Sequence, residues 1–174
     1  MRRRIVVSMA ALVLALSAVL AVSMGIGSAD AAHRDLLINR MKTEFTSGPF
    51  TGDTITFYGS GFWNTVTGAV DIQGMAVHKG ADGGLVDRLT WKATGVESFE
   101  SFGTLPGTPL EGGVLVLDAI IRPPDGPRLT VEDFTVVCLI GDVPPGFDEA
   151  VHIPSLGLDH TVHAPHRFTL FLQV

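Results

Sequence analysis

The C-terminal part of the chain gathers most of its histidines and could bind a metal ion. Four of the six histidines lie between residues 152 and 166. Imidazole and carboxylate groups are ligands that Zn²⁺ and Cu²⁺ take in proteins. The candidate metal ligands are His152, Asp159, His160, His163 and His166.

A histidine-bearing surface loop is the competing interpretation, and the spacing favours it. Side chains three residues apart on a regular strand point to opposite faces, which would separate His160 from His163. Only a turned segment could bring them together, and Pro165 is compatible with such a turn. We therefore expect no bound cofactor, with Zn²⁺ or Cu²⁺ at this cluster as the alternative.

Three carboxylates are candidates for acid–base catalysis. Glu97 and Glu100 stand on either side of Phe99, but their odd spacing places them on opposite faces of a regular strand. Asp118 interrupts an otherwise apolar stretch, and burial there would require a polar partner. A solvent-facing position at the margin of a sheet is the commoner situation for aspartate. The catalytic role of all three therefore stays open.

Aromatic side chains are the candidates for a ligand-binding surface, because aromatic rings supply much of the contact area in small-molecule sites. The candidate binding residues are Tyr58, Phe62, Trp63, Phe99 and Phe102. The same residues could equally build the core of the domain. Residues 59–61, Gly-Ser-Gly, are typical of a turn and lack the surroundings of a catalytic serine.

The first residues have the pattern of an export signal. Three arginines at positions 2–4 precede an apolar stretch over residues 5–22, and residues 29–31, Ala-Asp-Ala, resemble a cleavage site. We expect a signal peptide over residues 1–31, an N-terminal arm or first edge strand over residues 32–47, and one β-domain over residues 48–174. The protein would then be secreted, with an uncleaved membrane anchor as the alternative.

Charge and cysteine content restrict the partners of the secreted chain. Removing three of the 12 basic residues leaves 9, and removing Asp30 from the 18 acidic residues leaves 17, so the net charge becomes −8. Such an acidic domain is a poor candidate for binding nucleic acid or an anionic membrane. Cys138 is the only cysteine, which excludes an internal disulfide, and its apolar surroundings indicate a buried, unreactive thiol.

The stretch over residues 129–140 is the predicted centre of the domain. In its second half, odd- and even-numbered positions are both apolar. Because alternate residues of a strand face opposite sides, this pattern predicts a strand covered on both faces. The apolar residues occupy odd positions before Glu132 and Asp133 and even positions directly after them, which indicates a β-bulge. Its predicted partner is the apolar run at residues 114–121, connected through a Pro- and Gly-rich turn.

The remaining elements are also predicted strands separated by turns. Residues 54–58, 69–78, 85–94, 96–102 and 168–174 have strand-like alternation, and residues 151–154 could form a shorter strand. Trp91 should point inward and Lys92 outward, while Gly74 indicates a bulge or close packing under a larger neighbour. Gly95 should separate two strands. Eight or nine short strands without a helix predict an all-β antiparallel sandwich or a closed β-barrel.

Several segments in this order resemble a family of small secreted bacterial hypothetical proteins of the actinobacterial type. They are residues 61–64 (GFWN), 90–94 (TWKAT), 113–117 (GVLVL) and 135–141 (TVVCLIG), followed by Pro144, Pro145 and Glu149. The Gly-x-Gly-aromatic sequence at residues 59–62 is also similar to dirigent and allene-oxide-cyclase-like barrels. The bacterial family carries no assigned activity, so the resemblance implies no catalytic residue.

Three functions from different classes are compatible with these patterns. The leading hypothesis is a secreted, non-enzymatic β-domain that binds a small ligand, glycan or protein. The runner-up is a barrel enzyme of the cyclase or isomerase type, with Asp118, Glu97 or Glu100 facing an apolar lumen. The third is a structural or self-assembling surface protein whose N-terminal arm pairs with the edge of another copy.

Overall fold

A computed structural model describes residues 33–162 and 166–174 of the 174-residue chain. The elements of this described part are β1 (His33–Phe45), β2 (Thr54–Asn64), β3 (Val70–Lys79), β4 (Leu85–Thr104), β5 (Leu110–Arg122), β6 (Leu129–Cys138), β7 (Ala150–His152), the 3-10 helix η1 (Pro154–Leu156), β8 (Leu158–Val162) and β9 (Phe168–Gln173). The predicted signal peptide and His163 lie outside the described residues. In the described part, no helix has the length and apolar character needed to cross a membrane.

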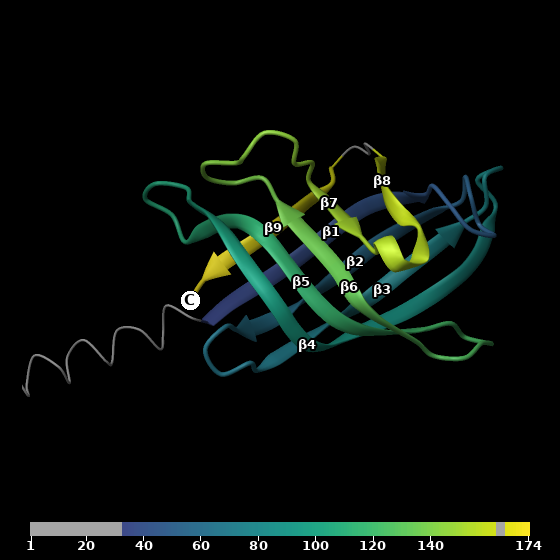
Figure 1. The fold of residues 1–174 in the computed structure, drawn as a ribbon, viewed down its shortest axis with the longest axis horizontal. Helices are drawn as coiled ribbons and strands as arrows, with labels where there is room; N and C mark the ends of the chain where they lie inside the picture. The colour runs from purple at the N-terminus through teal and green to yellow at the C-terminus, as the bar shows by residue number, and fades with distance from the viewer. Residues whose placement is uncertain (1–32, 163–165) are drawn as a thin grey trace, which may run out of the picture. The chain divides into compact units, whose positions relative to one another are not determined.

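All nine strands belong to one antiparallel sheet that closes on itself (Figure 1). Neighbouring strands follow the order β4-β3-β2-β1-β9-β5, and β5 also pairs with β4, which completes the ring. β5 pairs with β9 only at Leu110 and Glu111, and along the rest of that side it pairs with β6. β6 pairs in turn with β7, and β8 pairs with the second half of β1. The all-β prediction is confirmed, and of its two alternatives the closed barrel is the one that forms.

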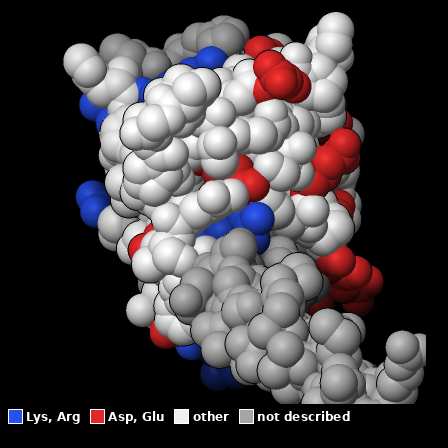
Figure 2. Space-filling model, turned by 90° about the vertical axis from the view of Figure 1, so that its left-hand side faces the viewer, with Lys and Arg blue, Asp and Glu red and all other residues white. Residues whose placement is uncertain are grey.

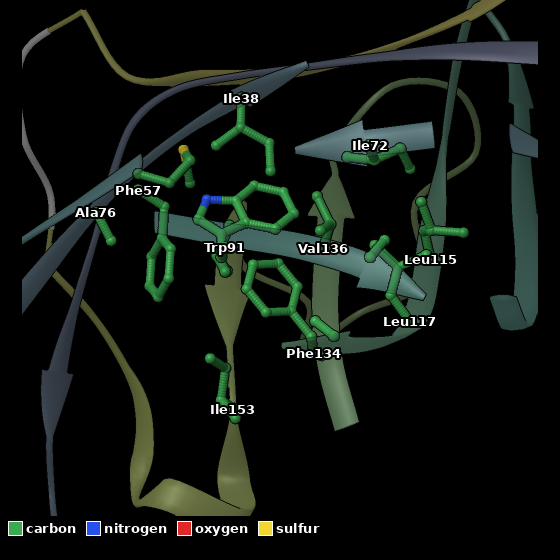
Figure 3. Packing of buried hydrophobic residues seen from close by; sticks show 14 of the residues in the cluster. Ile38, Phe57, Ile72, Ala76, Trp91, Leu115, Leu117, Phe134, Val136 and Ile153 are labelled. Atoms are coloured by element: carbon green, nitrogen blue, oxygen red, sulfur yellow. The ribbon is translucent and has the colours of Figure 1, made fainter. Parts of the chain in front are cut away.

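Aromatic rings fill the interior of the barrel. The rings of Trp91 and Phe134 stack with centroids 4.6 Å apart, and Phe57 meets Phe134 edge-on at 5.5 Å. In Figure 3, Trp91 lies among these buried side chains, with Ile38 above the indole and Phe134 below it. Trp91 is buried and Lys92 is exposed, as their parity predicted. The core therefore depends on side chains from strands on all sides of the ring.

The indole of Trp91 lies against two glycines that face each other across neighbouring strands. Gly59 of β2 pairs with Gly74 of β3, and Gly74 pairs with Trp91 of β4. A Cβ atom on Gly59 would lie 2.3 Å from Cζ2 of the indole, and one on Gly74 would lie 2.7 Å from Nε1. The indole Nε1 donates a hydrogen bond to the carbonyl of Tyr58 at 3.1 Å. The predicted close packing at Gly74 is therefore confirmed.

The central hairpin forms between β5 and β6 as predicted. Leu117 pairs with Phe134 and Ala119 pairs with Val131, so between these two pairs β6 contains one residue more than β5. The extra residue falls at Glu132 and Asp133, which confirms the predicted bulge. Val136, Val137 and Cys138 are all buried, as expected for a strand covered on both faces. The thiol of Cys138 is free and buried, and burial raises its pKa.

The strands β2 and β4 continue through two glycine-containing positions where the sequence predicted that they would end. β2 runs through residues 59–61, because Gly59 makes room for the Trp91 indole. β4 runs through Gly95, where the register shifts by one residue in a bulge. A Cβ atom on Gly95 would lie 2.6 Å from a carboxylate oxygen of Asp118 on β5. At both points the glycine admits a neighbouring side chain and does not end the strand.

Residues 32–47 were expected to be an arm or an edge strand, and the structure places most of them inside the ring. β1 pairs with β2 along one side. Its other side pairs first with β9 and then with β8. A strand with partners on both sides has few backbone groups free for another chain. The body of the barrel therefore begins at residue 33 and not at residue 48.

The packing of Trp91 predicts that its two glycines respond differently to the same substitution. Gly59→Ala should lower the free energy of unfolding by about 1–3 kcal/mol through overpacking against the indole. Trp91→Phe removes the atom that a new Cβ would meet, so Gly59→Ala should cost much less in that background. Gly74→Ala should stay costly in both backgrounds, because its Cβ would also lie 1.9 Å from the backbone carbonyl oxygen of Tyr58.

Denaturant unfolding of the parent, the three single variants and the two double variants measures these differences. Met75→Ala is the matched control, because Met75 lies on β3 beside Gly74 and is 43% exposed. If Gly59→Ala lowers the free energy of unfolding equally with and without Trp91→Phe, this account of the packing is wrong.

Candidate ligand-binding groove

An open groove of about 430 Å³ lies on the outer side of the barrel over β6, β7 and β8. Thr135 and Val137 of β6 line it, and they alternate with the core residues Phe134, Val136 and Cys138, so they face away from the interior. His152 of β7, Asp159, His160 and Thr161 of β8, and Gly146, Phe147 and Asp148 of the β6–β7 loop complete most of its wall.

The loop that walls the groove is held at both of its ends. After β6, the backbone N–H of Asp142 donates to the carbonyl of Phe102 at 2.6 Å. Before β7, a carboxylate oxygen of Glu149 accepts from the backbone N–H of Thr169 at 2.6 Å. Between these points, the Phe147 ring meets Phe102 with centroids 5.1 Å apart. This loop therefore lies over the outer face of β6 and forms one wall of the groove.

His152 provides a half-buried imidazole in the groove. It pairs with Thr135 across β6 and β7, which places the two side chains on the same outer face. Burial lowers the pKa of His152, although the carboxylates of Asp159 and Asp148 act in the opposite direction. The net lowering favours an uncharged ring that can both donate and accept a hydrogen bond.

β8 supplies the opposite wall, and no strand had been predicted there. Asp159 and His160 are exposed on it, and the hydroxyl of Thr46 donates to the Asp159 carboxylate. Thr161 is 6% exposed, and its hydroxyl oxygen has no hydrogen-bond partner among the described residues. The groove therefore combines carboxylates, imidazoles and hydroxyls around an apolar floor.

The predicted metal ligands are brought together only in part. His152, Asp159 and His160 line the same groove, whereas His166 is exposed at the start of the β9 segment, where its carbonyl accepts from Asn39 at 2.9 Å. His163 lies outside the described residues. In residues 33–162 and 166–174, no group of three or more histidine, cysteine or acidic side chains is arranged to hold a metal ion. Binding of Zn²⁺ or Cu²⁺ stays a prediction.

The predicted catalytic carboxylates do not face the interior. Glu97 and Glu100 are exposed on β4. Asp118 is half-buried and alternates with the core residues Leu117 and Ala119, so it points outward over Gly95. The acid in an apolar lumen that the enzyme hypothesis requires is therefore not formed by any of these three residues.

The predicted aromatic binding residues are divided between the two faces of the sheet. Trp63 is fully buried, and Phe99 packs on it with centroids 5.5 Å apart. Tyr58 and Phe62 lie on the outer face, where Phe62 stacks on His33. Phe102 is buried beneath Phe147 at the groove loop. Phe102 is thus the one member of the set that supports the groove, and the five do not form a single surface.

A polar cluster that the sequence did not predict lies inside one end of the barrel. Arg34 Nε donates to a carboxylate oxygen of Glu111 at 2.6 Å, and the hydroxyl of Ser101 donates to the other oxygen at 2.5 Å. The guanidinium also lies 4.7 Å from the centre of the Phe99 ring. Burial raises the pKa of Glu111, but hydrogen bonds from Arg34, Ser101 and Gln173 outweigh it, so the pKa is lowered overall.

This cluster has the character of a structural ion pair. Both side chains are largely buried, and they bond directly to each other. The alternation of the strands could have predicted this cluster. Arg34 falls on the same side of its strand as the buried Leu36, and Glu111 on the same side as the buried Leu115. The outer groove therefore remains the stronger candidate for ligand binding.

No protein-family model, curated protein or solved structure matches this chain. The resemblance to secreted bacterial proteins and to dirigent-like barrels therefore stays a prediction, and the function is argued from the groove.

Glu111→Gln should destabilise the protein in a pH-dependent way. At pH 7 the substitution removes the buried carboxylate charge that accepts a hydrogen bond from Arg34 Nε, and we expect a loss of roughly 3–5 kcal/mol in the free energy of unfolding. A carboxylate whose pKa is lowered by folding stabilises the fold above its unfolded pKa, and this contribution disappears as the pH falls through the folded pKa. The difference between parent and variant should therefore shrink in acid.

Chemical denaturation at pH 7 and at pH 3 tests this expectation, with the exposed Glu100→Gln as control. A difference that is unchanged at pH 3 would show that charge does not explain the effect.

The His152 ring should titrate at lower pH than an unperturbed histidine. We expect an NMR titration midpoint below about 6.5, because burial disfavours the imidazolium. Asp159→Asn should lower the pKa further, since that carboxylate favours the charged ring. A midpoint above the unperturbed value, or a rise on Asp159→Asn, would contradict the described surroundings of His152.

Proposed function

We propose that this chain is a secreted, non-enzymatic binding domain that holds a small polar ligand in the groove over β6, β7 and β8. The observation that carries the proposal is the grouping of the His152 imidazole, the Asp148 and Asp159 carboxylates and the Phe147 ring around one concave surface. Small-molecule sites combine an apolar wall with a few placed polar groups, and they have volumes of roughly 300–1,000 Å³.

The rigidity of the surroundings supports this proposal. Thr135 and His152 are cross-strand neighbours in the sheet, and the loop carrying Phe147 is held by the Asp142 and Glu149 hydrogen bonds. Groups held in place before binding lose little conformational freedom when a ligand arrives, which favours affinity. The groove is therefore better suited to a ligand than an exposed loop of the same composition.

The competing functions receive less support from the described residues. The acidic side chains proposed for a barrel enzyme point outward or are exposed, and aromatic rings occupy the interior. The segment proposed to pair with another copy is β1, whose two sides are already paired. A protein or glycan partner stays compatible with the groove, as long as the group that enters it is small and polar.

Filling the groove should abolish binding. We expect chemical-shift changes at Thr135, His152 and Asp159 when ¹⁵N-labelled protein is titrated with a panel of neutral sugars, amino acids and ammonium compounds. Thr135→Phe places a ring in the groove and should weaken binding by about tenfold or more, equivalent to about 1.4 kcal/mol.

Thr130→Phe is the matched control, because Thr130 is exposed on the same strand and does not line the groove. Shift changes that map to another surface, or equal binding by both variants, would overturn the assignment of the groove.

A further inference from the structure

The described residues that carry charge around the groove are all acidic. Asp148 and Asp159 line it, and no lysine or arginine of the described residues does so. In the described part of the chain, neither carboxylate forms a salt bridge. Some other acids on the barrel do have a basic partner, since Asp71 pairs with Lys92 and Glu111 pairs with Arg34. The groove thus keeps two carboxylates uncompensated by a basic side chain of the described barrel.

An aromatic ring lies on the same surface as these carboxylates. Phe147 is 40% exposed, and its contact with Phe102 holds the ring in place at 61° to its neighbour. The face of an aromatic ring attracts cations through its quadrupole. A fixed ring directly before Asp148 in the chain therefore adds a second feature that favours positive charge.

We infer that the ligand of the groove is a small organic cation, whose ammonium group lies between the Asp148 and Asp159 carboxylates and contacts the Phe147 ring. This inference rests on the proposed function and specifies its ligand class. Neutral polar groups, the imidazole of His152 and the hydroxyls of Thr135 and Thr161, can bond the uncharged part of such a ligand.

The charge of the whole protein favours the same class of ligand. The formal net charge of the chain is −6 at pH 7. On the face that Figure 2 shows, acidic groups gather along one side, and basic groups lie apart from one another. A field of this sign attracts cations and repels anions at low ionic strength.

A pair of probes that differ only in charge tests the inference. Choline carries a quaternary ammonium group, and 3,3-dimethylbutan-1-ol is its neutral isostere. NMR titration of the protein at pH 8 and low salt should give shift changes at Phe147, Asp148 and Asp159 with choline. Binding of the neutral isostere should be at least about fivefold weaker, and added NaCl should weaken choline binding.

Single-charge variants locate the effect. Asp148→Asn and Asp159→Asn should each weaken choline binding by about threefold to tenfold, because each removes one attracting carboxylate. Phe147→Leu should weaken it while keeping the apolar wall. Asp125→Asn is the matched control, since it makes the same charge change at an exposed position in the turn between β5 and β6.

The outcomes separate this inference from the proposed function. Equal binding of choline and its neutral isostere in the groove, or groove binding of sugars without choline, would overturn the cation assignment and leave a binding domain. Choline affinity that is unchanged in both Asp→Asn variants would also overturn it. The proposed function itself fails if no compound of either class perturbs the groove.

Discussion

The indole of Trp91 can occupy the interior only because the facing residues of two neighbouring strands have no side chains. Gly59, Gly74 and Trp91 form one row across β2, β3 and β4. A slip of one residue in either strand would place Ser60, Gln73 or Met75 beneath the ring and turn every inward side chain outward. The register of this half of the barrel is therefore set by where a large ring fits, and Phe134 stacks on that ring from the other half.

An interior filled in this way directs recognition to the outside of the barrel. The rings of Phe57, Trp91 and Phe134 occupy the middle, and the Arg34–Glu111 pair occupies one end. The outer groove depends instead on additions to the ring, namely the short strands β7 and β8 and the loop over β6. Val151, Ile153 and Leu158 of this segment belong to the core, so only its groove-facing residues can vary without disturbing the packing. A rigid scaffold commonly carries a binding site in this way.

Local patterns were sufficient for the parts of the fold that depend on alternation. The inward position of Trp91, the bulge at Glu132 and Asp133 and the burial of Cys138 each follow from the parity of nearby residues. The continuity of β2 through Gly59 could not be predicted this way, because the ring that requires a glycine there comes from Trp91, a residue two strands away. The pairing on the second side of β1 could not be predicted either, because β8 and β9 come from the far end of the described chain.

The candidate site shows the same division. His152, Asp159 and His160 were identified by residue type, and the fold brings them to one groove. Phe147 and Asp148 were not identified as site residues, because their role depends on how the β6–β7 loop folds back over the sheet. Residue type therefore indicated which groups could do chemistry, whereas tertiary contacts decided which of them meet.

The pairing of the first described strand with the last one constrains how the molecule can assemble. Arg34 of β1 lies opposite Gln173 of β9, so this seam joins residues from the two ends of the barrel sequence. During synthesis, β1 to β4 can form successive hairpins early, but one side of β1 stays open until the final residues emerge. Such distant contacts make folding slow. Until the seam is made, the apolar inner face has no lasting cover, and the incomplete chain is open to aggregation or to capture by a chaperone.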